Sequence, residues 1–287
     1  MRVRKAVITA AGWGTRFLPA TKSQPKEMLP LVDKPMIQYI VEEAVASGIE
    51  LIVVVTSLWK GTLEDHFDRS RELESFLEEK GNLELREEVG RISQLADICY
   101  IRQKEQLGLG HAILAAKLMV GEEPFAVFLP DDIIVGAVPA MKQMLEVHGR
   151  YGGSLLAIRR VEREQIGRFG IIDPERVAEG VYRVRNLVEK PDPERAPSNL
   201  GVVGRYVLSP SIFPALEKTL PGKGGEIQLT DGLATLLATE EVFGYEFQGT
   251  WLDAGTPLSL LKASVSLALG RPDMEEEMRH FLKELLR

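Results

Sequence analysis

A glycine-rich turn near the start of the chain carries its own positive charges. Gly12 and Gly14 follow an apolar run that is typical of a buried strand. The next cations along the chain are Arg16, Lys22 and Lys26. Glycine lets a backbone turn sharply or come close to a ligand, and the N–H groups of such a turn form a cradle for anions. This combination suits a bound triphosphate, although an ordinary tight turn with surface cations would contain the same residue types.

The turn does not match the two most familiar phosphate-binding motifs. A dinucleotide-binding fingerprint needs a third glycine at the position of Phe17, and the Gly-x-x-x-x-Gly-Lys-Ser/Thr string of a P-loop is absent. The sequence therefore predicts an anion site of another kind.

A pair of carboxylates follows a second apolar run. Asp131 and Asp132 come directly after residues 125–129. Acidic residues are common turn formers at strand ends, but bound Mg²⁺ also takes one or two carboxylates together with phosphate oxygens and water. Because successive strand residues point to opposite faces, we expect only one of the pair to face a metal. The single cysteine, Cys99, lies within a strand pattern and is interpreted as a core thiol.

The elements that must position these residues alternate between strand and helix patterns in the first half of the chain. We expect strands over 51–56, 97–102 and 125–129, and helices over 36–46, 63–80, 111–119 and 140–147. This order predicts a parallel sheet covered on both faces. Ligands of such sheets bind at the carboxyl ends of the strands, where the glycine turn and Asp131 both fall. We therefore expect them to share one site.

The second half of the chain is less regular. We expect strands over 154–160, 169–173, 182–189, 202–208 and 242–247, and helices over 210–217, 227–239, 257–269 and 274–286. The polar, proline-rich loop 192–199 is too short for a domain linker. The sequence therefore predicts one domain over 1–287, with two halves at about 1–150 and 151–256 and C-terminal helices at about 257–287.

Composition narrows the class of protein. A net charge of −7 argues against a nucleic-acid-binding or membrane-surface protein. No apolar run approaches the roughly 20 residues of a membrane span, and the chain begins with charge rather than with a signal peptide. One cysteine fits a reducing compartment, so we expect a cytoplasmic protein without nucleic-acid or membrane partners.

The string Gly-x-Gly-Thr-Arg-x-x-Pro from Gly12, followed by Pro-Lys-Glu-Met-Leu-Pro over 25–30, resembles the signature of sugar-phosphate nucleotidylyltransferases. These enzymes join a nucleoside triphosphate to a sugar 1-phosphate. The resemblance covers essentially the whole chain and is closest to the bacterial uridylyltransferase branch, whose substrates are UTP and glucose 1-phosphate. It implies an α/β, Rossmann-like nucleotidyltransferase fold, in which helices sandwich a mostly parallel mixed sheet. It also implies a homodimer or homotetramer.

The resemblance assigns roles to individual residues. The catalytic residues would be Arg16, Lys26 and Lys190. The nucleotide would be bound by Ala11, Gly12, Gly14, Thr15, Arg16, Lys26, Gln103 and Gly108. The sugar phosphate would be bound by Gly170, Glu189, Lys190 and Asn199. Gln103 offers one donor and one acceptor, which suits the imide edge of uracil or thymine. Without the resemblance, Glu189 and Lys190 would be interpreted equally well as a surface salt bridge.

The resemblance also implies Mg²⁺ as the cofactor. Asp131 aligns with the aspartate of the family's Leu-x-Asp motif, and Asp253 with the second metal ligand of the family. By itself, Asp253 would be interpreted as a turn residue or a helix cap.

One departure leaves the base preference open. The uridylyltransferase branch often has lysine where this chain has Thr250, and residues 251–256 look like those of glucose-1-phosphate thymidylyltransferases. A thymidylyltransferase is therefore the first alternative. The second is a non-catalytic regulatory protein that binds a nucleotide sugar on the same fold. Such a protein should lose residues such as Arg16, Lys26, Asp131 or Asp253, and all of them are present.

Overall fold

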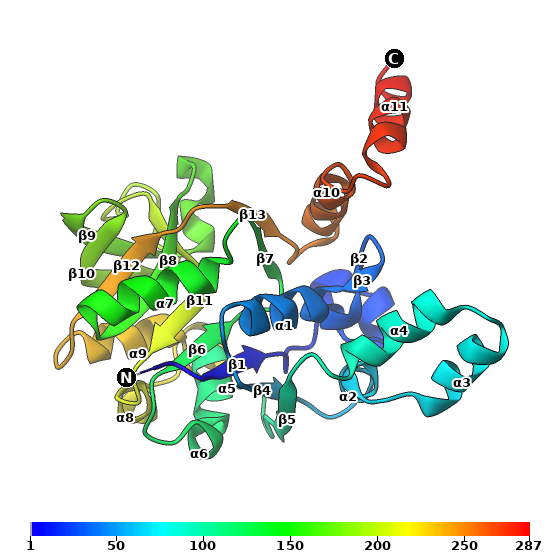
Figure 1. Ribbon diagram of the computed structural model, residues 1–287. Helices are drawn as coiled ribbons and strands as arrows, with labels where there is room; N and C mark the ends of the chain where they lie inside the picture. The colour runs from blue at the N-terminus through cyan, green and yellow to red at the C-terminus, as the bar shows by residue number, and fades with distance from the viewer. Residues whose placement is uncertain (1) are drawn as a thin grey trace.

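The structure is a computed structural model that describes residues 2–287, with a nine-stranded mixed sheet at its centre (Figure 1). The strand order is β5-β4-β1-β6-β11-β8-β12-β10-β9. The first four strands in this order are parallel to one another, as the alternating strand and helix patterns predicted. They are β1 (Lys5–Thr9), β4 (Leu51–Thr56), β5 (Asp97–Arg102) and β6 (Phe125–Phe128).

The second half of the chain continues the same sheet but mixes strand directions. β11 is antiparallel to both β6 and β8, whereas β12 is parallel to β8. β10 is antiparallel to both β12 and β9 at the far edge. These strands are β8 (Ser154–Arg160), β9 (Gly170–Ala178), β10 (Val181–Glu189), β11 (Leu200–Leu208) and β12 (Val242–Glu246). The predicted α/β class with a mixed sheet is confirmed, and every antiparallel pair of this sheet includes a strand from the second half.

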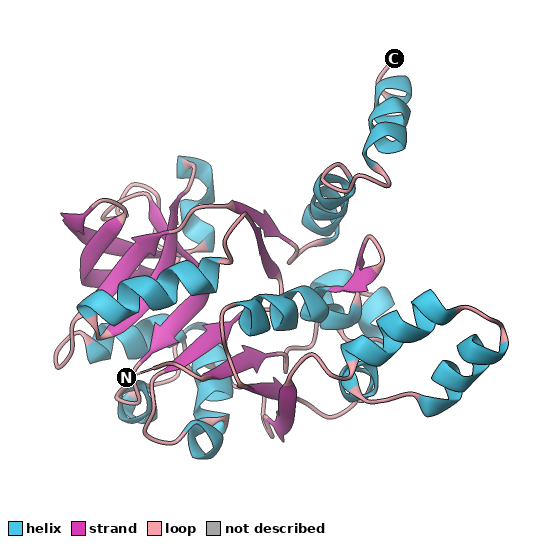
Figure 2. Ribbon diagram, in the orientation of Figure 1, coloured by secondary structure: helices cyan, strands magenta, loops and turns pink. Residues whose placement is uncertain are grey.

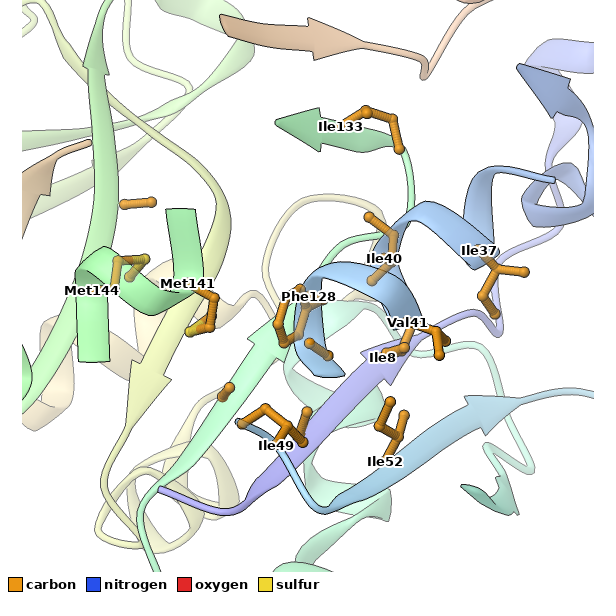
Figure 3. Close-up of a cluster of buried hydrophobic side chains, with 14 of the residues drawn as sticks. Ile8, Ile37, Ile40, Val41, Ile49, Ile52, Phe128, Ile133, Met141 and Met144 are labelled. Carbon is orange, nitrogen blue, oxygen red and sulfur yellow. The ribbon is translucent and has the colours of Figure 1, made fainter. Parts of the chain in front are cut away.

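Helices cover both faces of the sheet because alternate strand residues point to opposite sides. Ile8 and Phe128 face a core that includes Ile40 and Met141 (Figure 3). The helices on this side are α1 (Met36–Ala46) and α7 (Ala140–Tyr151). Val7 belongs to the core on the opposite face. The helices there are α5 (Leu109–Ala115), α6 (Lys117–Val120), α8 (Ile212–Lys218) and α9 (Leu229–Leu236).

A second, two-stranded sheet lies beside the carboxyl end of β6. Strand β7 (Asp132–Val135) pairs antiparallel with β13 (Thr250–Asp253), with Asp132 opposite Asp253. Neither strand was expected from the sequence, because the residues around Asp132 and Asp253 are also typical of turns. The pairing joins segments from opposite ends of the chain and brings the two candidate metal ligands toward each other.

The other elements lie around this framework (Figure 2). The helix expected over 63–80 is divided into α2 (Thr62–Phe67) and α3 (Arg71–Glu79), and α4 (Leu83–Ile92) follows them. The C-terminal helices are α10 (Pro257–Ala268) and α11 (Glu275–Leu285), and α11 projects from the body. The remaining pieces are the hairpin β2 (Pro30–Leu31) and β3 (Lys34–Pro35), and short 3₁₀ turns at Thr15–Phe17, Ala20–Lys22, Lys26–Met28, Arg163–Arg168 and Lys223–Gly225. Over residues 2–287, no helix is long and apolar enough to span a membrane.

Candidate active site

A cavity of about 760 Å³ lies between the two halves of the chain. Both halves and the C-terminal helix α10 contribute charged side chains to its wall. These are Arg16, Asp131, Asp132, Arg168, Glu189, Lys190, Glu226, Asp253 and Lys262. A cavity of this size can hold a nucleotide sugar or a drug-sized ligand. Arg16 from the glycine turn and Asp131 from the end of β6 thus reach one site.

Hydrogen bonds fix the backbone of the glycine turn and leave free space at Gly12. Directly after β1, Ala10 N donates a hydrogen bond to Val55 O, and the side chain of Phe17 is buried. Gly14 has φ of 66°, a left-handed conformation that favours glycine, and its carbonyl accepts a hydrogen bond of 2.8 Å from Thr21 Oγ1. A Cβ atom on Gly12 would meet no protein atom within 4 Å. The space above Gly12 is therefore free for a ligand that approaches the backbone.

Lys26 forms an ion pair with Asp131. Their Nζ and Oδ2 atoms are 2.7 Å apart, and both side chains are partly buried. Burial acts to lower the pKa of Lys26, but the charges of Asp131 and Glu27 outweigh it and raise that pKa above 10.5. Burial likewise acts to raise the pKa of Asp131, but the Lys26 charge leaves it below its usual value. Both groups are therefore charged at neutral pH.

Asp131 and Asp253 converge on the same small space beside Gly255. A Cβ atom placed on Gly255 would lie 3.2 Å from Asp131 Oδ2 and 3.1 Å from Asp253 Oδ1. The other oxygen of Asp253 accepts a hydrogen bond of 2.8 Å from Arg168. Over residues 2–287, no group of three or more His, Cys, Asp or Glu side chains could hold a metal ion. Two converging carboxylates beside Lys26 nevertheless fit a hard cation that takes its other ligands from phosphate and water.

Asp132, the neighbour of Asp131, makes its own set of contacts. Its Oδ1 atom accepts a hydrogen bond of 2.5 Å from Trp251 Nε1, and its carboxylate lies against Gly204. Burial, followed by the charge of Asp131, raises the pKa of Asp132 to about 7. Asp132 lines the cavity, so it is a functional candidate that the resemblance did not include.

Glu189, which was expected to bind the sugar, lines the cavity and contacts two polar side chains. Thr230 Oγ1 donates to Glu189 Oε2 at 2.5 Å, and Lys190 Nζ lies 2.7 Å from Glu189 Oε1. A Cβ on Gly170 would lie 3.2 Å from Thr230 Oγ1 and 3.4 Å from Glu189 Oε2. Glycine at this position thus leaves room beside the carboxylate. Lys190 has φ of 45°, an uncommon conformation for a residue with a side chain.

Gln103 and Gly108 lie together beside the cavity rather than in its lining. Gln103 is buried, and its Nε2 atom donates to Gly108 O at 3.1 Å and lies 3.0 Å from His111 Nδ1. Gly108 has φ of 95° and packs against Glu226, which lines the cavity. Ile227 N donates to Leu107 O at 2.7 Å. The segment that carries Thr230 therefore also supports the loop that was expected to contact the base.

The structure brings together most of the residues expected at the site. The cavity lining includes Arg16, Asp131, Gly170, Glu189, Lys190 and Asp253. Lys26 joins them through Asp131, and Ala11, Gly12, Gly14 and Thr15 form the adjoining turn. Asn199 is exposed and does not belong to the lining, so the geometry gives its expected sugar contact no support.

Sequence reasoning did not assign roles to several residues that line the cavity. They are Asp132, Arg168, Gly204, Thr230 and Trp251. The one sequence signal near Thr230 is the polar string Glu-Ile-Gln-Leu-Thr-Asp over 226–231, which can begin a helix. The contact between Arg168 and Asp253 joins positions far apart in the chain, which no local pattern predicts.

Residues 5–269 match the family model described as nucleotidyl transferase. The chain belongs to this family. It is 51% identical over 286 residues to a UTP–glucose-1-phosphate uridylyltransferase of Bacillus subtilis, an alignment that covers 100% of this chain and 96% of the relative. This similarity confirms the resemblance that the sequence motifs indicated.

Solved structures of the same kind have the same fold. A UTP-bound UGPase from Acinetobacter baumannii superposes with a TM-score of 0.92 at 40% identity, over 99% of each chain. A UDP-glucose pyrophosphorylase complexed with UDP-glucose superposes with a TM-score of 0.86 at 43% identity, over 94% of this chain and 100% of the other. The nucleotidyltransferase fold expected from the sequence is therefore confirmed.

Proposed function

We propose that this protein is an enzyme that forms UDP-glucose and pyrophosphate from UTP and glucose 1-phosphate. The observation that carries the proposal is that two ion pairs from different halves of the chain lie at one cavity. Lys26 and Asp131 come from the first half of the chain, and Glu189 and Lys190 come from the second. The uridylyltransferase relative that matches this chain over its whole length supports the choice of substrates.

The reaction joins an anion to an anion. An oxygen of the sugar phosphate attacks the α-phosphorus of UTP in line, and the bond to the pyrophosphate oxygen breaks. The attacking phosphate is already negatively charged at neutral pH, so the step requires no general base. Repulsion and poor alignment form the barrier, and the protein lowers it by positioning the reactants and neutralising their charge.

Three cations of the site would act in this step. Arg16 would stabilise the leaving pyrophosphate, and Lys26 would bind the triphosphate near the reacting centre. Lys190 would orient the attacking sugar phosphate, next to Glu189, which would accept hydrogen bonds from sugar hydroxyls. The raised pKa of Lys26 supports its role, because a protonated amine is needed to bind phosphate.

We propose Mg²⁺ as the cofactor, held by Asp131 and Asp253. Their convergence beside Gly255 supports this pair as the protein's share of the ligands. When bound, the ion would orient the α-phosphate and offset the charge that develops on it. Arg168 contacts Asp253 at 2.8 Å and would share that carboxylate with the ion. A cytoplasmic location and a homodimeric or homotetrameric state remain further proposals, as does the single domain over 1–287.

A thymidylyltransferase is the second candidate, because residues 251–256 look like that branch. Uracil and thymine differ by one methyl group on a shared hydrogen-bonding edge. Such a difference is worth about 1–3 kcal/mol of discrimination. We therefore expect UTP to be the preferred substrate and dTTP to be a detectable second one.

Initial rates with several nucleoside triphosphates and sugar 1-phosphates test these proposals. We expect pyrophosphate release with UTP and glucose 1-phosphate to exceed release with dTTP, and purine triphosphates to react poorly. Gln103→Ala should lower kcat/KM for UTP and reduce the selectivity against CTP, whose base has a different donor pattern. Equal rates with ATP and UTP would contradict the base assignment.

A further inference from the structure

A buried ion pair lies beneath the glycine turn, outside the cavity. Lys60 Nζ donates to Glu27 Oε2 at 2.8 Å and to the carbonyl oxygen of Ala10 at 2.6 Å. Lys60 is only 7% exposed and Glu27 is fully buried. The lysine belongs to the loop between β4 and α2, which does not contribute to the cavity lining.

The partners of Lys60 lie at the two ends of the nucleotide-binding segment. Ala10 is the residue at which the chain leaves β1 and enters the glycine turn. Glu27 directly follows Lys26 in the 3₁₀ turn Lys26–Met28. The Lys26 side chain reaches Asp131 at the site, whereas the Glu27 side chain reaches Lys60 in the interior. One ammonium group therefore joins the start of the turn to the residue beside the triphosphate-binding lysine.

Stability does not by itself explain this pair. Burying two charges costs about as much as their attraction returns, and apolar replacements of similar volume are often as stable or more stable. Burial lowers the pKa of Lys60 below 10.5, although Glu27 opposes that change. Within the described residues, Glu27 Oε1 has no hydrogen-bond partner, so the carboxylate depends on Lys60. What the pair does supply is a fixed distance between two backbone segments.

We propose that Lys60 is a positioning residue for the nucleoside triphosphate. By holding the Ala10 carbonyl and the Glu27 carboxylate together, it fixes the glycine turn relative to Lys26. The inference rests on the proposed function and deepens it. It requires that loss of Lys60 weakens binding of the nucleotide and leaves binding of the sugar phosphate unchanged. The proposed sugar-phosphate ligands, Glu189 and Lys190, are held by other contacts.

The first test replaces Lys60 with a residue of similar length and no charge. In Lys60→Met, we expect the Kd for UTP with Mg²⁺, measured by calorimetry, to rise about 10- to 100-fold, the effect of a misplacement of about 1 Å. We expect KM for glucose 1-phosphate to stay within about threefold. Lys5→Met is the matched control, because Lys5 also donates to a carbonyl, Val120 O, at 2.8 Å and pairs with Glu123, at the opposite end of β1. It should bind UTP as the native protein does.

A paired variant separates positioning from charge compensation. Lys60→Met combined with Glu27→Met removes the unpaired carboxylate, so it should melt close to the native temperature but still bind UTP weakly. Native UTP affinity in either variant would overturn the proposal, as would an equal loss for both substrates. If the native protein bound no UTP, the proposed function itself would fail, which is a distinct result.

Discussion

The Nζ atom of Lys26 lies 2.7 Å from Oδ2 of Asp131, although 105 positions separate the two residues in the chain. The lysine follows the glycine turn, and the aspartate follows β6. Each group keeps the other charged, as the directions of their pKa shifts indicate. The ammonium that we propose to bind phosphate and the carboxylate that we propose to bind a metal thus lie side by side.

Removing the charge of Lys26 should impair use of the triphosphate. We expect Lys26→Met to lower kcat/KM for UTP by about 30- to 1,000-fold, since a phosphate contact that strengthens in the transition state is worth about 2–4 kcal/mol. Initial rates at varied UTP measure this. Lys34→Met is a control, because Lys34 also forms an ion pair of 2.7 Å, with Glu42, outside the site. Similar losses in both variants would remove the special role of Lys26.

Lys190 should act on the other substrate. We expect Lys190→Ala to lower kcat/KM for glucose 1-phosphate by roughly 30- to 1,000-fold, because the attacking phosphate loses its contact with the lysine ammonium. Equilibrium binding of UTP to the same variant provides the control and should change little. A variant with near-native kcat/KM for glucose 1-phosphate would show that the assignment is wrong.

The hydroxyl of Thr230 should matter through Glu189, to which it donates at 2.5 Å. Thr230→Val keeps the shape and removes that hydrogen bond, which is worth about 1.5–3 kcal/mol when the acceptor is charged. We expect kcat/KM for glucose 1-phosphate to fall about 10- to 150-fold, and Thr230→Ser to restore most of it.

Thr235→Val is the matched control for Thr230. It removes a hydroxyl from the same helix, α9, that donates only to the backbone carbonyl of Asp231. Its initial rates should be native. If Thr230→Val behaves like this control, Glu189 does not need Thr230 to bind the sugar.

Chelation of divalent metal should stop turnover. We expect no pyrophosphate release in excess EDTA, and full recovery when Mg²⁺ is added back. Asp131→Asn and Asp253→Asn should each raise the Mg²⁺ concentration needed for half-maximal rate, because each removes one charged oxygen ligand. Calorimetric titration of Mg²⁺ into the UTP complex checks the same point without turnover. Undiminished turnover in the chelator would exclude a metal role for the two carboxylates.

Patterns that repeat over a few residues predicted the elements well. The expected bounds 36–46, 51–56 and 97–102 are those of α1, β4 and β5, because apolar periodicity and β-branched runs are local properties. The β7–β13 pair was missed because its register depends on two segments that only the complete fold brings together.

For the candidate site too, local motifs predicted some residues, whereas long-range contacts could not be predicted. Motif resemblance assigned roles to Lys26, Asp131 and Glu189, which belong to strings that can be read along the chain. It assigned no role to Lys60, whose importance arises from contacts with Ala10 and Glu27 rather than from a motif. The sugar contact that the motif assigned to Asn199 stays a prediction, since this exposed residue lies outside the cavity lining.

The most direct test of the central claim follows the oxygen atoms. UTP, Mg²⁺ and glucose 1-phosphate labelled with oxygen-18 at its non-bridging phosphate oxygens are incubated with the protein, and the products are analysed by mass spectrometry. We predict UDP-glucose and pyrophosphate in equal amounts, with all of the label in UDP-glucose, because the sugar phosphate is the nucleophile. Absence of UDP-glucose, or label in the pyrophosphate, would contradict the account.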